Sequence, residues 1–482
     1  MSIPAWPPLK AVPQQLRSRM ASLQLLSSVV LQAQSLQQQQ DLVLKQLPEQ
    51  DRAFAMQLLL GSLRCYEPLR ALVRQFLRQS LKAKQRWLEP LLVLGAYQLL
   101  AMNLASRAVV HSMAELPKLL QQPHLTGLVN GVLRAMTRAN LDIERLYQHD
   151  TSQDQANSKA GAEHWLLEQI RQDWPEQASS IISAQRRQSP MMLRVNSQQI
   201  DRELYLRHLS AQQIEVDSAL QSTLPMCRDL IELVQSQPVQ HLPGFESGQV
   251  SVQDASAQLA VELLLSELSS QPSNTMSHTH QASSPPTLRL LDACAAPGGK
   301  TAHLLERLGN RVQLCALDSE ATRLKRLRQN LTRLQLDSEH VSITAQTLQA
   351  YAMQHTASAQ ARFDAVLLDA PCSGTGVISR HPDIVWCRRQ SDIDTLAQLQ
   401  RELLAHAASL VKPGGLLLYA TCSILKQENS LNIEQFLQTT SYAIEAVSIA
   451  ASWGEAQSYG RQRLPGIHPG DGFYYALMRI QS

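Results

Sequence analysis

Apolar residues follow helical spacing through the first part of the chain. They recur at intervals of three and four positions in residues 42–77, 87–102 and 125–138, where clusters of β-branched residues are few. Glycine and proline stand mainly between these runs. The pattern predicts an all-α bundle over residues 1–148, in which several amphipathic helices share one core.

A different alternation begins near residue 288. Apolar runs typical of buried strands are each followed by a stretch with helical spacing, and continuously apolar strands of this kind indicate a parallel sheet covered by helices on both faces. We therefore expect an α/β, doubly wound, Rossmann-like domain over residues 249–482, with a late strand at 471–480. The other strand-like runs are 288–294, 312–318, 363–371 and 415–423.

Two polar stretches separate these parts. Residues 149–162 have the composition of a linker. Residues 269–287, rich in Ser, Thr, His and Pro, predict a disordered insertion, although two histidines there could instead bind a metal. Residues 163–248 combine a helical start at 163–174 with extended pieces such as 190–196, and they predict a small α+β segment. The chain is therefore expected to be multidomain.

Positive charge is concentrated near the N-terminus. The chain carries 44 Lys and Arg against 41 Asp and Glu, but residues 1–140 hold 16 of these cations and only 6 of the acids. Such a segment could hold a polyanion, and a stripe along one helix would contact nucleic-acid phosphates in a salt-sensitive way. An ordinary solvated helix surface is the alternative. Five cations that recur every four residues predict this stripe: Arg70, Arg74, Arg78, Lys82 and Arg86.

Several classes of protein are disfavoured by the composition. No uninterrupted apolar run approaches the roughly 18 residues of a membrane span, and the N-terminus lacks the layout of a signal peptide. Seven cysteines lack the paired spacing of a disulfide or zinc framework. We expect a cytoplasmic monomer without a membrane segment or a bound metal.

A glycine-rich turn lies between the first predicted strand of the α/β domain and its helix, in LLDACAAPGGKT (290–301). A P-loop would need glycine where Cys294 stands, and the G-x-G-x-x-G spacing of a dinucleotide fold is absent. Asp318, at the tip of the next strand, could accept both ribose hydroxyls of an adenosine group, although an Asp that caps the following helix is the common alternative. Together they favour an adenosyl ligand without phosphate, of which S-adenosylmethionine is the obvious candidate.

Two cysteines each follow a predicted strand and stand among polar residues: Cys372 in AVLLDAPCSGTG and Cys422 in GLLLYATCSIL. Methyl transfer to C5 of a pyrimidine would use both, because one thiolate adds to C6 to activate C5 and a second group helps to undo that bond. Asp369 stands at the right strand tip to hydrogen-bond N3 of the ring, and Lys300 is a candidate cation for stabilising a thiolate. The spacing alone leaves open which cysteine attacks.

Four separated motifs resemble those of the RNA cytosine-C5 methyltransferases: CAAPGGKT (294–301), DAPCSGTGVISRHPDI (369–384), YATCSILKQENS (419–430) and DGFYYA (471–476). Within that family the chain resembles the bacterial Sun/Fmu type, which acts on 16S ribosomal RNA. The basic N-terminal bundle, with LVNGVLR at 128–134, is similar to the NusB-type RNA-binding domain that those enzymes carry. The likeness covers nearly the whole chain.

The resemblance implies roles for individual residues. Cys422, in the T-C-S motif, would be the nucleophile, and Cys372, in the P-C motif, would assist elimination and release. In DNA cytosine methyltransferases the P-C cysteine attacks instead. Asp369 would lie between the cofactor and the target base. The residues implied to bind or face S-adenosylmethionine are Cys294, Ala295, Ala296, Pro297, Gly298, Gly299, Lys300, Asp318 and Asp369.

One departure and several open points accompany this resemblance. The family usually has a further Asp at the end of the third strand, where Gln346 is the nearest match and offers only an uncharged amide to the adenine. Trp386 and Tyr419 are candidate stacking platforms for a base of single-stranded or looped RNA, and a core residue is the common alternative for each. A transfer RNA substrate, or a non-catalytic RNA-binding assembly factor, remains an alternative. The cysteines interpreted as small buried hydrophobic residues are Cys65, Cys227, Cys315 and Cys387.

Overall fold

The computed structural model describes residues 4–102, 104–139, 141, 164–270, 288–356 and 362–481. Two compact units make up the chain: Met1–Gln188 with Val377–Arg389, and Ser189–Gly376 with Gln390–Ser482. The predicted linker 149–162 lies outside the described residues. So does most of the predicted insertion 269–287, of which only Ser269 and Ser270 are described, at the end of a helix. The division into domains 1–148, 163–248 and 249–482 stays a prediction.

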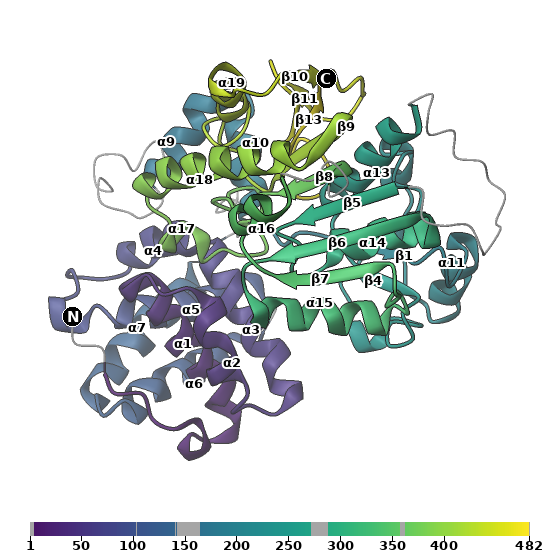
Figure 1. Cartoon of the computed structure of the whole chain (residues 1–482). Coiled ribbons are helices and arrows are strands. Elements are labelled where there is room, and N and C mark those ends of the chain that lie inside the picture. The colour runs from purple at the N-terminus through teal and green to yellow at the C-terminus, as the bar shows by residue number, and fades with distance from the viewer. Residues whose placement is uncertain are drawn as a thin grey trace. The chain divides into compact units, whose positions relative to one another are not determined.

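The first unit is helical around a central helix, α5 (Leu88–Ala101). Leu91, Leu92 and Leu94 of α5 are fully buried, and a helix that is apolar on nearly all sides has to be enclosed by others. Helices α1, α3, α4, α6 and α7 all contact α5. Their bounds are α1 Gln14–Gln32, α3 Glu49–Arg64, α4 Tyr66–Gln75, α6 Ser106–Leu119 and α7 Thr126–Arg138; the unit also contains α2 Leu36–Leu44, α9 His164–Asp173, α10 Ala178–Gln185 and α17 Ile384–Cys387 (Figure 1).

The predicted cationic stripe along one helix is wrong. Helix α4 ends at Gln75, so Arg70 and Arg74 lie on it, whereas Arg78, Lys82 and Arg86 lie in the connection to α5. The chain leaves the helix because the next buried residues, Trp87 and Leu88, have to reach the core of the unit. Tertiary burial of this kind overrides helix propensity.

The second unit begins with a small antiparallel sheet of strand order β2-β3-β1-β4. Its strands are β1 Met191–Val195, β2 Val216–Asp217, β3 Leu230–Leu233 and β4 Val250–Val252, with helices α11 Arg202–Ala211 and α12 Ala219–Thr223 between them. The predicted helical start (α9) and extended piece (β1) of the 163–248 segment are both present. Helix α13 (Ala255–Ser270) leads from the small sheet to a larger one.

The larger sheet has the strand order β11-β12-β13-β9-β8-β5-β6-β7, and β10 pairs with β13. Strands β5 to β9 are parallel, as expected, but the late strand β13 runs antiparallel to β9 and carries β10 and β12 antiparallel to itself. The sheet is therefore mixed. The strands are β5 Leu288–Ala293, β6 Val312–Asp318, β7 Val341–Ala345, β8 Phe363–Asp369, β9 Val411–Thr421, β10 Ile444–Val447, β11 Glu455–Ala456, β12 Arg461–Arg463 and β13 Phe473–Ile480.

Helices cover both faces of this sheet, which confirms the doubly wound α/β fold. Leu290 and Leu314 point to the face packed by α13, α14 and α15. Leu291 and Leu317 are at alternate positions of the same strands and pack on the opposite face. Helices α16, α18 and α19 cover that face (Figure 1). These helices are α14 Gly299–Leu308, α15 Ala321–Arg333, α16 Leu348–His355, α18 Gln390–Ser409 and α19 Ser430–Thr439.

Candidate active site

The carboxyl ends of four parallel strands bring most of the predicted site residues to one edge of the sheet. Strand β5 lies between β6 and β8, and the strand order reverses there, so this edge contains the topological switch point at which α/β sheets bind ligands. Asp318 ends β6 and Asp369 ends β8. Cys422 directly follows β9.

The turn between β5 and α14 is built from unusual backbone conformations. Cys294 has a φ of 66° and Gly298 a φ of 101°, and the left-handed region favours glycine. A Cβ on Gly298 would come within 2.8 Å of Leu327 on α15, so this position also needs the missing side chain. The turn therefore approaches α15 closely and begins helix α14 with exposed backbone N–H groups toward the strand ends.

Asp318 binds the same turn. One carboxylate oxygen accepts a hydrogen bond from the backbone N–H of Ala296 at 3.2 Å, and the other accepts from the N–H of Glu320 at 3.0 Å. Arg323 lies 3.4 Å from the carboxylate and donates to the Ala296 carbonyl at 2.8 Å. A carboxylate has about four acceptor positions, so these contacts leave Asp318 able to accept from a further hydroxyl.

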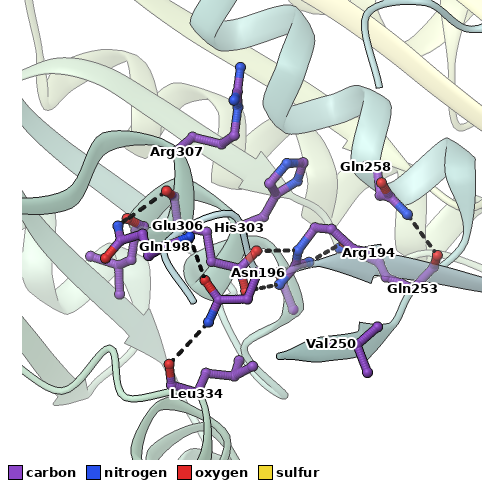
Figure 2. A network of polar contacts seen from close by, with 12 residues as sticks. Arg194, Asn196, Gln198, Val250, Gln253, Gln258, His303, Glu306, Arg307 and Leu334 are labelled. Atoms are coloured by element: carbon purple, nitrogen blue, oxygen red, sulfur yellow. Dashed lines mark hydrogen bonds and ion pairs between the residues drawn. The ribbon is translucent and has the colours of Figure 1, made fainter. Parts of the chain in front are cut away.

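A buried arginine of the small sheet binds helix α14. Arg194 of β1 is fully buried and forms two hydrogen bonds to the carboxylate of Glu306 on α14, at 2.6 and 2.8 Å. Another N–H of Arg194 donates to the carbonyl of Gly299 at 2.9 Å. Figure 2 shows Arg194 and Asn196 side by side, with Asn196 donating to the carbonyl of Leu334 beyond α15 at 3.1 Å. The small sheet thus fixes the helix that starts at the candidate cofactor turn.

Asp292, near the end of β5, is a site residue that the sequence analysis did not single out. It is fully buried, and Thr301 donates to one of its carboxylate oxygens at 2.6 Å. Its other oxygen has no hydrogen-bond partner among the described residues. Burial raises the pKa of Asp292 to about 7, helped by the charge of Asp369, although the Thr301 hydrogen bond opposes the shift. Only a structure could identify it, because the strand pattern does not tell which polar end residue is enclosed.

Lys300 and Asp369 form an ion pair beside the cysteines. The Lys300 ammonium lies 2.6 Å from the Asp369 carboxylate, and the lysine side chain is 11% exposed. Burial lowers the pKa of Lys300, but the charge and hydrogen bond of Asp369, with Asp292 adding to them, outweigh it and raise the pKa overall. The ammonium also lies 4.9 Å from the centre of the Phe473 ring. Lys300 is therefore charged, and its ammonium group is paired with the carboxylate of Asp369.

The two cysteines of the predicted pair lie together. The sulfur atoms of Cys372 and Cys422 are 3.4 Å apart. Gly376, four residues after Cys372, donates its N–H to the carbonyl of Cys422 at 2.9 Å, and its own carbonyl accepts from Gly472 at 2.9 Å. Three motifs far apart in sequence are thus joined through one glycine.

Cys372 is the thiol that stays protonated. Its hydrogen bond with Cys422 is the largest cause of a pKa raised well above that of an ordinary cysteine, followed by burial and by the charges of Cys422 and Glu428. Its sulfur lies within hydrogen-bond distance of the sulfur of Cys422, and either thiol can be the donor.

The two candidate stacking platforms, Tyr419 and Trp386, belong to different units of the chain. Tyr419 is fully buried inside the sheet and donates its hydroxyl to the carbonyl of Glu428 at 2.7 Å, so its ring is closed to a base. Trp386 belongs to the helical unit, where its ring packs edge-on against Tyr66 at 5.0 Å. Tyr419 is therefore a core residue, in agreement with a strand that is covered on both faces of the sheet.

The remaining predicted residues lie as follows. Cys65, Cys227 and Cys315 are buried, as interpreted, while Cys387 is half-buried. Gln346 follows β7, and its backbone N–H donates to the carbonyl of Asp318 at 3.0 Å, so it stands beside the candidate ribose site.

The part of the chain that the structure describes contains no candidate membrane span and no candidate metal cluster. No helix there is long and apolar enough to cross a membrane. No group of three or more His, Cys, Asp or Glu side chains is arranged to hold a metal ion in the same part of the chain.

Three family models match successive parts of the chain. Residues 16–138 match the NusB family, residues 163–240 match the ferredoxin-like domain of RsmF/B-like methyltransferases, and residues 284–479 match the 16S rRNA methyltransferase RsmB/F family. The helical N-terminal fold and the α/β methyltransferase fold predicted from the sequence are confirmed by these matches.

Relatives extend over nearly the whole chain. The ribosomal RNA small subunit methyltransferase B of Yersinia pestis is 37% identical over 452 residues, which cover 94% of this chain and 96% of the relative. The protein of the same name from Vibrio cholerae is 40% identical over 437 residues, or 91% of each chain. The resemblance predicted from the four motifs is confirmed.

Solved structures share the fold. The crystal structure of PH0851 superposes with a TM-score of 0.69 at 21% identity, covering 97% of this chain and 99% of that one. The structure of NSun6 from Pyrococcus horikoshii with SFG has a TM-score of 0.53 at 18% identity, and covers 66% of this chain and 98% of that one.

Proposed function

We propose, because this chain belongs to the 16S rRNA methyltransferase RsmB/F family, that it transfers a methyl group from S-adenosylmethionine to C5 of a cytosine in 16S ribosomal RNA. The reaction would proceed through a covalent bond between Cys422 and C6 of the base. The observation that carries this proposal is the pair of thiols 3.4 Å apart at the edge that also holds the Lys300–Asp369 ion pair.

The residues at the strand ends fit S-adenosylmethionine. Asp318 and Asp369 give this edge a negative character that disfavours phosphate and suits a sulfonium cation with an ammonium group. Asp318 retains acceptor capacity for ribose hydroxyls, and Asp292 has a buried oxygen without a partner among the described residues. The turn 294–299 would lie against the ligand. When bound, S-adenosylmethionine supplies the methyl group.

Cys422 would act first. As a thiolate it adds to C6 of the cytosine, and the electrons of the C5–C6 double bond move into the ring toward N3 and O2. Lys300 can donate to those atoms, while Asp369 can accept from the amino group at N4. C5 would then take up the methyl group as the bond from that methyl group to the sulfonium sulfur breaks, and the sulfur would leave as a neutral thioether that keeps the electrons of the bond. The ion pair would thus hold the base through both donor and acceptor and stabilise the charge that develops on it.

Release would need both cysteines. After methylation the proton on C5 would pass to a base such as solvent water, the electrons of the C5–H bond would re-form the C5–C6 double bond, and the bond from C6 to the sulfur of Cys422 would break. Cys372 keeps its S–H proton, and this group lies 3.4 Å from the departing sulfur. A hydrogen bond from Cys372 would stabilise the thiolate as it leaves.

The helical unit offers a surface for the RNA. A groove of about 1020 Å³ on this unit is lined by Arg70, Arg74, Arg86, Glu89 and Trp386, among others, and Arg74 pairs with Glu89 at 3.1 Å. Arg78, Lys82, Lys84 and Arg86, in the connection between α4 and α5, are all exposed, and residues 78–86 contain no acid. Cations beside an aromatic ring are typical of single-strand binding. We propose that this groove holds RNA that flanks the target base.

Methyl incorporation tests the proposal. Purified protein, labelled S-adenosylmethionine and unmodified 16S rRNA should give labelled 5-methylcytosine after digestion to nucleosides. Unmodified transfer RNA serves as the competing substrate. Binding of 16S rRNA without any incorporation would leave a non-catalytic binding role, and incorporation only into transfer RNA would change the substrate class.

A further inference from the structure

We infer that Glu428 is a positioning residue that fixes the distance between Cys372 and Cys422 by binding the turns that carry both. This inference rests on the proposed function for its meaning, but its geometry stands apart from it. Glu428 lies six residues after Cys422, in the loop between β9 and α19, and its side chain is fully buried.

The carboxylate of Glu428 binds the turn after β8. The backbone N–H of Ser373, the residue after Cys372, donates to one carboxylate oxygen at 2.8 Å. The hydroxyl of Ser373 donates to the other oxygen. Gln400 of α18 donates to Glu428 at 3.0 Å and to the carbonyl of Pro371, the residue before Cys372, at 2.9 Å. The carboxylate therefore holds Ser373 directly and Pro371 through Gln400, and these are the two neighbours of Cys372 in the chain.

The same carboxylate binds the turn after β9. The hydroxyl of Ser423, the residue after Cys422, donates to Glu428 at 2.6 Å, and its oxygen accepts the N–H of Leu425 at 3.1 Å. Ser373 and Ser423 also lie 3.3 Å apart, hydroxyl to hydroxyl. One side chain thus bridges the residues that directly follow the two cysteines.

The arrangement calls for a carboxylate and not merely a polar group. Glu428 accepts from four donors, two on each oxygen, which is the pattern of an acceptor-only ionised group. No lysine or arginine pairs with it in the described part of the chain, so its contacts serve the two turns alone. A glutamine at position 428 would replace one carboxylate oxygen by an NH2 group. This group would face groups that already donate hydrogen bonds to that position. The turns would then lose contacts from the common anchor, and the sulfur atoms would lose their fixed spacing.

The spacing can be measured without any RNA. In a glutathione redox buffer the two thiols are oxidised to a disulfide while oxidised glutathione is reduced, and the effective concentration of one thiol toward the other reports how well they are held. Peptide mapping by mass spectrometry identifies the Cys372–Cys422 pair. Glu428→Gln should lower this effective concentration by about tenfold or more. Glu262→Gln is the matched control, because Glu262 is also buried but binds His303 and Arg307 instead.

Turnover provides the second readout. Glu428→Gln should lower kcat on the order of 100-fold, as expected for misplaced reacting groups, with the KM values for RNA and cofactor within about twofold of wild type. Ser423→Ala should lower kcat as well, and combining both changes should cost less than the product of the two effects, because they remove one shared contact.

The outcomes distinguish the positioning role of Glu428 from the proposed methyl transfer. A disulfide that forms equally well in Glu428→Gln and wild type overturns the positioning role, and so does a loss no larger than that of Glu262→Gln. A weakened thiol pair in a protein that methylates no RNA would support the positioning role while contradicting the proposed function. Normal wild-type methylation with no effect of Glu428→Gln on kcat overturns the inference alone.

Discussion

At the scale of single residues, burial divides the cysteines by reactivity. Burial is the largest cause that raises the pKa of Cys294 to about 12 and that of Cys387 to about 11, so both are thiols at neutral pH. Cys372 is also held protonated, chiefly through its hydrogen bond with Cys422. The sulfur of Cys372 lies 3.4 Å from that of Cys422, the proposed nucleophile.

Replacing Cys422 by serine should abolish methyl transfer, because a hydroxyl is a far weaker nucleophile at neutral pH than a thiolate. Labelled-methyl incorporation into 16S rRNA measures the loss. Binding of RNA and cofactor should remain, since neither is proposed to depend on the sulfur. Substantial residual transfer by Cys422→Ser would assign the nucleophile elsewhere.

Replacing Cys372 by alanine should have a different effect. Addition and methylation would proceed, but the bond to C6 would break slowly without the S–H donor 3.4 Å away. A protein–RNA adduct should accumulate and appear as a slow band on a denaturing gel. If that band forms with Cys422→Ser and not with Cys372→Ala, the two roles are exchanged.

Asp292 should make stability depend on pH. Its pKa is raised from 3.8 to about 7 by burial, so between pH 4 and pH 7 the folded protein holds a proton that the unfolded chain releases. Stability is fully present below pH 4 and falls as pH rises through 7, by at most on the order of 4 kcal/mol. Asp292→Asn should remove this fall, which urea unfolding of ligand-free protein at pH 5 and pH 8 would measure. The same substitution at the exposed Asp337 is the control. Equal pH profiles for Asp292→Asn and wild type would contradict the argument.

At the scale of elements, the sequence predicts which residues gather at the sheet edge better than it predicts the buried side chains that hold them in place. Polar residues after apolar runs mark strand ends, and parallel strand ends share one edge, which is why Cys372, Cys422 and Asp369 could be expected together. The supporting side chains carry no such signal. Arg194 and Glu428 are charged residues whose burial arises only when distant segments fold against them. A charged residue in a sequence is normally read as exposed.

Element boundaries fail for a similar reason. The spacing of Arg70, Arg74 and Arg78 continues a helix, but α4 ends at Gln75, because Trp87 and Leu88 are buried in the bundle. Helical periodicity reports local geometry, whereas the end of α4 depends on contacts with residues more than ten positions away.

Helix α14 should depend on Arg194. Replacing Arg194 by methionine would leave the Glu306 carboxylate buried without its cation, and breaking a buried pair in this way typically costs about 3–5 kcal/mol. The double variant Arg194→Met with Glu306→Leu should recover most of that loss, because it removes both charges. Urea unfolding of the four proteins in this cycle measures the coupling. A double variant as unstable as Arg194→Met alone would mean that packing, not charge, holds the helix.

At the scale of the whole molecule, charge and chemistry lie in different parts of the chain. Residues 1–140 hold 16 of the 44 cations and 6 of the 41 acids, whereas the two thiols and the three strand-end carboxylates lie in the second unit. Phosphate contacts bind RNA without reading its sequence. Affinity and chemistry should therefore respond to different substitutions.

Reversing one charge that lines the groove (Arg86) and one in the connection beside it (Lys82) should weaken RNA binding without changing the chemical step. Lys82→Glu with Arg86→Glu should raise the Kd for a single-stranded RNA. It should also flatten the dependence of log K on log salt, by about 0.7 for each lost phosphate contact. At saturating RNA, kcat should stay near the wild-type value. Arg107→Glu with Arg134→Glu carries the same charge change on α6 and α7 and should weaken binding much less. An equal loss in both double variants would mean that the net charge of the unit, and not the groove lined by Arg86 and Trp386, attracts the RNA.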